Sequence, residues 1–178
     1  SSISYNDFSD LKMGKRGPSD YLRLQYVQTE AGQDKLVLNP DNRIQNPTAY
    51  NQINVLQKVI FKPSIFLHYS LGVYYSETSD YARYDRLIRP SKDEKGLRSA
   101  VWNYGPQKWL MTNFQMTHNP ENSFYEGLKF TAAYQKFGES RYDRNFGETS
   151  LYETEESVDA LSFNRDFEQR KKASFRLF

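Results

Sequence analysis

The chain has 178 residues with 24 basic and 22 acidic side chains, a net charge of +2 and no cysteine. This composition excludes a disulfide scaffold, a cysteine zinc site and a cysteine nucleophile, and it gives no electrostatic reason to bind nucleic acid. Aromatic residues make up 16% of the chain, too many for a wholly disordered protein, and no apolar run approaches the ~18 residues of a membrane helix. A membrane β-barrel is still compatible, because its strands need only alternate.

The two ends of the chain both resemble the interior of a strand. The chain opens at Ser1 without the basic and apolar regions of a signal peptide, and it ends in the alternating residues 174–178. We therefore expect residues 1–178 to be part of a longer protein, with a first strand beginning at Ile3 and Tyr5.

Alternating hydrophobicity is clearest between residues 65 and 75. One face carries Ile65, Leu67, Tyr69, Leu71, Val73 and Tyr75, and the other carries Phe66, His68, Ser70, Gly72 and Tyr74. Because side chains alternate across a strand, this pattern predicts a continuous apolar stripe on one side. The β-branched and aromatic content also favours a strand over a helix.

The same pattern recurs along the chain. Further strands are expected at residues 53–61, 102–116, 124–134 and 161–167, and a last one at Phe175 and Leu177. The alternation fails locally at Leu56, Ile60, Trp109 and Met111. The pattern predicts an all-β fold of about seven antiparallel strands and no helix.

The connections between these strands alternate in length. Short turns are expected at residues 62–64, 119–123 and 168–172, and long polar connections at 14–47, 77–99 and 137–156. Short connections at one end and long ones at the other are typical of an up-and-down transmembrane β-barrel. Residues 82–86 and 140–144 share the pattern Arg-Tyr-Asp-Arg, which indicates similarity between successive hairpins.

Several stretches resemble the barrel of TonB-dependent outer-membrane receptors. The resemblance covers most of the chain and is carried by residues 1–14, 69–70, 78–87, 104–109 and 133–144. It implies a segment of a larger barrel of about 22 strands with a plugged lumen. The plug domain and the TonB box are absent from residues 1–178, so this segment is not expected to transport anything alone.

The resemblance also implies a function and a location. Such receptors import scarce ligands such as ferric siderophores or haem across the outer membrane of a Gram-negative bacterium. The partners implied are outer-membrane lipid, a small-molecule ligand such as a metal chelate, and TonB-ExbB-ExbD acting through an N-terminal region missing from this chain. No nucleic acid partner and no cofactor are expected.

The two Arg-Tyr-Asp-Arg motifs supply the candidate ligand-binding residues. They and a neighbouring tyrosine are Tyr81, Arg83, Tyr84, Arg86, Arg141, Tyr142 and Arg144. Arginine binds anionic groups bidentately, and tyrosine stacks or donates a hydrogen bond. The same residues also suit a cross-strand ladder of Arg and Asp with tyrosines of an aromatic girdle, and that girdle is equally expected for Tyr74, Tyr75, Trp102, Tyr104 and Trp109.

The sequence predicts neither an enzyme nor a metal site. His68 and His118 are far apart in the sequence, no calcium-loop spacing is present, and no catalytic triad or phosphate loop appears. Two alternatives to the transporter stay open. One is a passive porin-like barrel with the same wall, and the other is a soluble all-β carbohydrate-binding module with Trp102 and Trp109 stacking on sugars.

Overall fold

The computed structural model describes residues 1–93, 95–121 and 123–169. These residues form ten strands, one short α-helix and one 3-10 turn. In chain order they are β1 (Ser2–Phe8), η1 (Ser19–Tyr21), β2 (Gln25–Glu30), β3 (Gln33–Leu38), β4 (Tyr50–Phe61), β5 (Leu67–Thr78), β6 (Tyr81–Ala82), α1 (Tyr84–Leu87), β7 (Ser99–Tyr104), β8 (Lys108–His118), β9 (Tyr125–Asn145) and β10 (Tyr152–Gln169). Neither described helix is long and apolar enough to cross a membrane.

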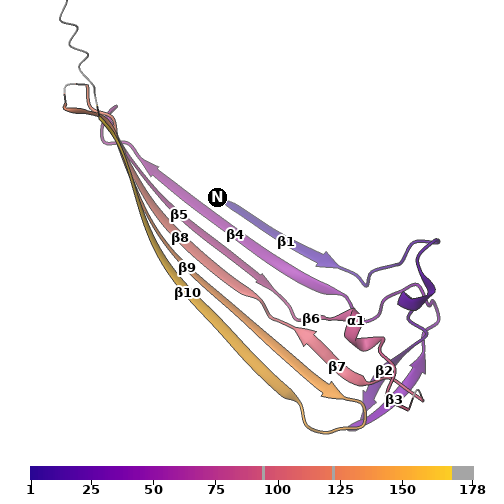
Figure 1. Ribbon diagram of the computed structural model, residues 1–178. Helices are drawn as coiled ribbons and strands as arrows, with labels where there is room; N and C mark the ends of the chain where they lie inside the picture. Colours follow the sequence, from indigo (N-terminus) through magenta and orange to yellow (C-terminus); the bar gives the residue numbers. More distant parts are fainter. Residues whose placement is uncertain (94, 122, 170–178) are drawn as a thin grey trace, which may run out of the picture.

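Eight of the strands form one antiparallel sheet. Its order is β1-β4-β5-β8-β9-β7-β6, and β10 pairs with the other edge of β9. β6 and β7 pair with each other beyond the ends of β5 and β8 (Figure 1). If β6 is counted as a continuation of β5, and β7 of β8, the sheet is six strand lines wide, and successive lines follow one another along the chain. The prediction of an all-β, antiparallel, up-and-down fold is confirmed. The sheet is open, with β1 and β10 as its edges.

The estimate of about seven strands was too low because the long connections contain strands of their own and the strand expected at 102–116 is divided into β7 and β8. β2 and β3 form a separate two-stranded hairpin inside the connection from β1 to β4. β6 and α1 lie in the connection from β5 to β7. We name the residues 9–49, 79–93, 95–98 and 146–151 the loop region; it lies at one end of the sheet, opposite the short turn at 62–66 and the short connection from β8 to β9 (Figure 1).

At the C-terminal side one expected connection is wrong and a second lies mostly outside the described residues. The predicted long connection at 137–156 is mostly strand. β9 and β10 pair with each other along their length, from Leu128 opposite Phe167 to Asp143 opposite Tyr152. Polar residues continue these strands by pairing across them, as Arg141 does with Glu156 at 3.2 Å. The predicted turn at 168–172 begins inside β10, and its remainder lies outside the described residues, as do Phe175 and Leu177.

The register sorts the side chains of the sheet into two faces. Residues directly opposite each other in antiparallel strands share a face. The face defined by Leu71 and its partners, named the apolar face, carries Ile3, Tyr5, Ile53, Val55, Val59, Phe61, Leu67, Tyr69, Leu71, Val73, Tyr75, Leu110, Phe114, Met116, Leu128, Phe130, Tyr134, Leu161, Phe163 and Phe167. The other, named the polar face, carries His68, Ser70, Gly72, Asn113, Gln115, Thr131, Gln135, Ser162 and Asn164, with Leu56, Ile60, Trp109 and Met111 among them.

A break at residues 105–107 moves two aromatic residues to the polar face. Tyr104 pairs with Arg141 and Lys108 pairs with Gly138, so one strand line holds one residue more than its partner. One extra residue reverses the alternation. Trp102 and Tyr104 therefore lie on the face opposite Leu110, although a single strand over 102–116 would have placed them together.

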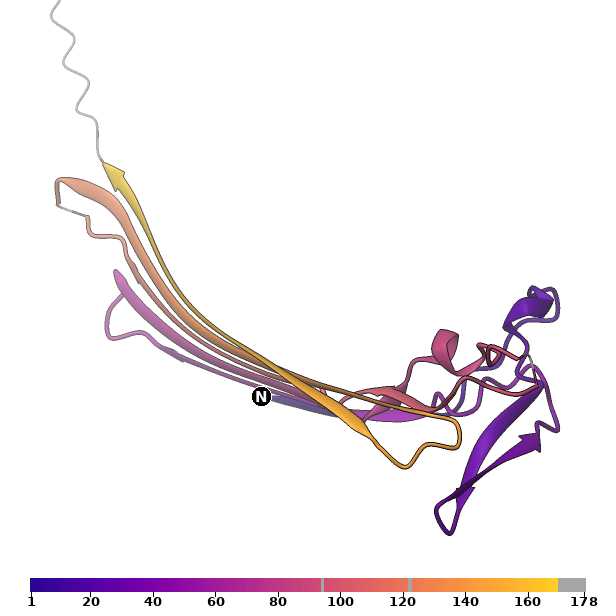
Figure 2. The ribbon, with the colours of Figure 1, turned by 60° about the horizontal axis from the view of Figure 1, so that its bottom comes forward.

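The sheet has no apolar core on either side. Among the described residues, the only buried hydrophobic side chains are Leu87 and Leu97, and both lie in the loop region. Figure 2 shows the sheet from the side as one curved layer, with nothing stacked against its length. The apolar face is therefore exposed: Leu71 is 50% exposed and Phe163 66%.

Candidate functional site

A buried ion pair fastens the β2–β3 hairpin to the end of β9. The Arg144 guanidinium donates from Nη1 to Asp34 Oδ2 at 2.7 Å and from Nη2 to Asp34 Oδ1 at 2.8 Å. The Gly147 amide donates to the same carboxylate at 2.9 Å, and Arg144 also donates to Thr29 Oγ1 at 3.0 Å. The Asp34 side chain is 1% exposed. Because Arg144 stabilises the ionised carboxylate, the pKa of Asp34 lies far below its usual value.

A second buried arginine holds the rest of the loop region together. Arg23 is 2% exposed, its Nε donates to the Asn46 carbonyl at 2.9 Å, and Nη1 donates to the Leu87 carbonyl. Burial disfavours its charged form and lowers the pKa of the guanidinium. Its guanidinium also lies 5.9 Å from the centre of the Tyr84 ring. These contacts join α1 to the connection between β1 and β4.

A row of aromatic rings crosses the polar face at the end of the sheet that carries the loop region. It runs from Phe8 to Tyr50 (4.7 Å between ring centres), to Tyr81 (5.7 Å), to Tyr104 (5.9 Å) and to Trp102 (5.2 Å). The rings come from β1, β4, β6 and β7. This row forms because the break at 105–107 turns β7 over relative to β8.

Two arginines from the loop region cover the end of this row. The guanidinium of Arg83 lies 5.1 Å from the centre of the Trp102 ring and that of Arg86 lies 5.7 Å from it. Arg83 also donates to Asp85 at 2.8 Å and to the Tyr104 hydroxyl at 3.2 Å. The candidate site is therefore a platform of aromatic rings with two cations above it, an arrangement that suits a flat or anionic ligand.

The structure divides the predicted ligand-binding residues into two groups. Tyr81, Arg83 and Arg86 lie together around the aromatic row. The others are held elsewhere by contacts within the protein: Tyr84 donates to the Tyr21 carbonyl at 2.6 Å, Arg141 pairs with Glu156, Tyr142 donates to Asp80, and Arg144 binds Asp34. The two Arg-Tyr-Asp-Arg motifs also differ in structure, since the first forms α1 and the second lies in β9.

The residues expected to form an aromatic girdle lie on both faces of the sheet. Of these residues, Tyr75 lies on the apolar face, whereas Tyr74, Trp102, Tyr104 and Trp109 lie on the polar face. On the apolar face the aromatic side chains gather instead toward the short-turn end. They are Phe61, Tyr69, Phe114, Phe124, Tyr125, Phe130, Phe163 and Phe167, with ring centres 5.2 to 6.4 Å apart in successive pairs.

The two histidines lie apart from each other. His68 is on the polar face, as its parity predicts, and His118 Nδ1 lies 2.6 Å from the Tyr125 hydroxyl. Within the residues that the structure describes, no group of three or more His, Asp or Glu side chains is placed to hold a metal ion.

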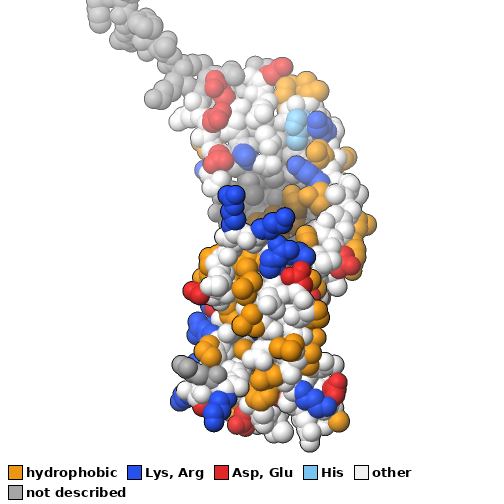
Figure 3. Space-filling view, turned by 90° about the vertical axis from the view of Figure 1, so that its right-hand side faces the viewer, with side chains coloured by type: hydrophobic (Ala, Val, Ile, Leu, Met, Phe, Trp, Pro, Cys, Tyr) orange, Lys and Arg blue, Asp and Glu red, His pale blue; other side chains and the backbone are white. Residues whose placement is uncertain are grey.

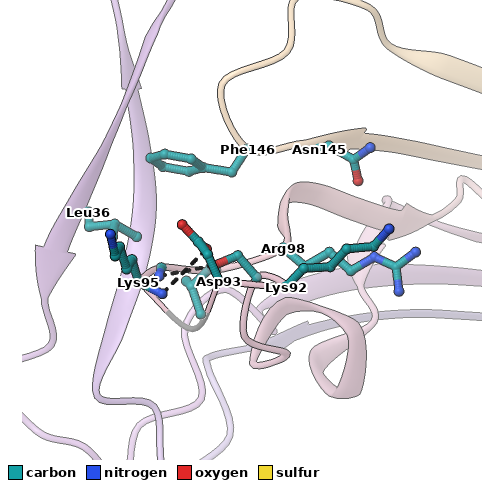
Figure 4. A pocket seen from close by; sticks show the side chains of 10 residues that line it. Leu36, Lys92, Asp93, Lys95, Arg98, Asn145 and Phe146 are labelled. Carbon is teal, nitrogen blue, oxygen red and sulfur yellow. Dashed lines mark hydrogen bonds between the residues drawn. The ribbon is translucent and has the colours of Figure 1, made fainter.

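Two neighbouring pockets in the loop region are rich in basic side chains. The larger has a volume of about 450 Å³ and lies between Leu36 of β3, residues 91–93 and 95–98, and Phe146 (Figure 4). Lys92 and Arg98 extend toward the same side of it. The smaller, about 70 Å³, lies between α1, β7 and β9 and shares Arg98 and Asn145 with the larger. Figure 3 shows this end of the molecule, where Lys and Arg side chains lie among hydrophobic and acidic ones.

The sequence analysis missed four residues of these sites. Asp34 is a single acidic residue in polar surroundings, Asp143 lies in the second repeated motif but was not proposed as a site residue, and Arg89 and Arg98 lie outside the motif. For Arg89 and Arg98 the signal was the density of arginine between residues 83 and 98, in the predicted long polar connection at 77–99. Their positions depend on contacts between segments far apart in the sequence.

Comparisons with known proteins produced no match: no protein-family model, no curated protein and no solved structure matches the chain. The fold itself defines the class of the protein as all-β, built on one open antiparallel sheet with a structured loop region at one end.

Proposed function

We propose that the chain forms part of the wall of a transmembrane β-barrel in the outer membrane of a Gram-negative bacterium, of the TonB-dependent receptor kind. The observation that carries the proposal is the exposed apolar face, which extends over six strand lines without a covering layer among the described residues. A soluble sheet buries such a face against a second layer. In a bilayer, the hydrocarbon covers it.

The height of the apolar face matches a bilayer. In β5 the uncharged stretch of this face runs from Leu67 to Tyr75, close to the roughly 9–11 residues that a tilted strand needs to cross the hydrocarbon. Charged residues begin at the end of this stretch nearest the loop region, where Lys108 pairs with Glu77 at 3.3 Å. On the edge strand β10, Asp159 and Arg165 interrupt the face, and Arg165 lies 5.7 Å from the centre of the Phe167 ring.

The open edges of the sheet fit the same proposal. β1 and β10 each leave one edge of backbone N–H and C=O groups without a strand partner among the described residues. Lipid cannot satisfy these groups, so a membrane-spanning sheet must pair both edges with further strands. In the proposed barrel, these strands come from the rest of the same protein.

The polar face and the loop region then meet the ligand. In such a barrel the polar face lines the lumen and the long connections lie outside the cell. The aromatic row, Arg83 and Arg86 lie where these two parts join. They support capture of a small anionic ligand, such as a ferric siderophore or haem, with import driven by TonB-ExbB-ExbD acting on other parts of the protein.

A scan with single cysteines tests the membrane wall. These 178 residues contain no cysteine, so after replacement of any cysteine elsewhere in the whole protein each substitution carries one spin label. We expect labels at Val59, Leu71 and Phe163 to contact molecular oxygen dissolved in lipid and to be shielded from a water-soluble nickel chelate. Labels at Ser70, Asn113 and Ser162, on the polar face, should show the reverse.

The same measurement separates a membrane wall from a soluble module. The experiment uses the whole protein containing this chain, reconstituted in phospholipid vesicles. If labels on the apolar face are inaccessible to both reagents, another protein layer covers that face and the membrane proposal is wrong. If both faces are equally open to the nickel chelate, neither face contacts lipid.

Deletion of TonB tests energy coupling. We expect a strain lacking the gene that encodes this chain to grow poorly with ferric siderophores or haem as sole iron source, and the restored gene to rescue growth only when TonB is present. Rescue that persists without TonB would identify a passive porin-like barrel instead. Growth of the deletion strain equal to the parent on every iron source would remove iron ligands from the proposal.

A further inference from the structure

We propose that the small pocket between α1, β7 and β9 binds a phosphoryl group. Three guanidinium groups line it, from Arg86, Arg89 and Arg98, together with Asp143 and Trp102. This site goes beyond the proposed transport function and does not depend on it, because its argument uses only the lining of the pocket and not the apolar face of the sheet.

An unsatisfied donor points to a ligand. Arg86 Nε is buried and has no hydrogen-bond partner among the described residues, and its nearest carboxylate oxygen, of Asp85, lies 3.8 Å away. That distance gives charge attraction but no hydrogen bond. A buried donor without a partner is costly, and native proteins almost always satisfy one. A ligand oxygen in the pocket would supply the missing acceptor.

The charges around the pocket match a doubly charged anion. Its lining carries three guanidinium groups and one carboxylate, an excess of two positive charges. Asp85 lies behind two of the arginines, 3.8 Å from both Arg86 and Arg89, and offsets part of this excess. A phosphate monoester carries about −1.5 to −2 charges at neutral pH and offers three acceptor oxygens to separate donors. A carboxylate offers one charge and two oxygens.

The size of the pocket limits what it can hold. Its volume is about 70 Å³, and on the same measure the site of one water molecule takes about 10–15 Å³. The pocket therefore fits one compact oxyanion and excludes a whole chelate. Arg98 and Asn145 also line the larger basic pocket beside it, so the remainder of a larger phosphorylated molecule has room next to the bound group.

Binding of inorganic phosphate tests the site. The probe is titrated calorimetrically into the detergent-solubilised protein that contains this chain, and the fluorescence of Trp102 is followed in a Trp109→Phe background. We expect saturable phosphate binding that Arg86→Gln weakens at least tenfold, because the substitution removes a charge-assisted donor. We expect Asp143→Asn to strengthen it, because the substitution removes the negative charge from the lining.

Matched variants keep the result specific. Arg43→Gln removes the same charge from a residue that pairs with Asp41 outside the pocket, and should leave binding unchanged. Arg98→Gln tests the pocket without altering the Arg86–Trp102 contact and should weaken binding like Arg86→Gln. Tighter binding of glycerol phosphate than of inorganic phosphate would identify the ligand as part of a larger molecule. Binding no tighter than that of acetate, or equal loss with Arg43→Gln, overturns the proposal.

Discussion

Leu71→Arg is expected to lower the free energy of unfolding in a bilayer by about 2–4 kcal/mol, the cost of an arginine on the lipid face near the midplane. Leu71 lies midway between Leu67 and Tyr75 on the apolar face of β5, and it is 50% exposed. Lipid offers the guanidinium neither water nor a counterion at this depth. The measurement is a urea titration of the whole protein refolded into phospholipid vesicles.

The neighbouring residue supplies the matched control. Ser70→Arg places the same side chain in the same strand on the polar face, where the proposed lumen solvates it, and it should change the free energy of folding by less than about 0.5 kcal/mol. Equal costs at the two positions would mean that the faces do not differ in environment. A cost at Ser70 alone would place lipid on the polar face and reverse the orientation of the sheet.

Alternation was sufficient to predict the sheet but not its ends. The strands at residues 53–61 and 65–75 follow from side-chain parity, because a strand with one apolar face repeats every second residue. The halves of β9 and β10 nearest the loop region lack this signal. Their side chains are charged and aromatic, and they stay in the sheet through pairs such as Arg141–Glu156. A polar stretch that pairs with another polar stretch cannot be told from a loop by its composition.

The candidate site was only partly predictable for a related reason. Tyr81, Arg83 and Arg86 were found from a local motif, whereas Trp102 reached the same place because one extra residue at 105–107 reversed its face. The β2–β3 hairpin was also missed. Its two-residue turn has positive φ at Ala31 and at Gly32, a conformation for which asparagine-glycine is the usual signal and alanine-glycine a weak one.

Asp34→Asn is expected to detach the β2–β3 hairpin from β9 at a cost of about 3 kcal/mol, since removing one partner of a buried ion pair leaves the other charge uncompensated. The contact joins residues 110 positions apart in the sequence. Hydrogen exchange of the β2 and β3 amides should become roughly a hundredfold faster, while exchange in β5 and β8 stays unchanged. Arg144→Gln should have a similar effect, and the double variant should cost less than the sum, because both remove one interaction.

An exposed ion pair in the same hairpin provides the comparison. Lys35 and Glu30 lie 2.7 Å apart with side chains 58% and 52% exposed, so Lys35→Gln should cost about 0–1 kcal/mol.

The acid dependence of the contact between the hairpin and β9 follows from the lowered pKa of Asp34. Its contribution is fully present above the unfolded pKa of about 3.9 and is lost only as the pH falls toward the lower folded value. A spin-label distance between Gln28→Cys and Thr149→Cys should therefore stay constant from pH 7 to pH 5 and increase only under stronger acid. An increase already at pH 5 would show that this carboxylate does not hold the hairpin.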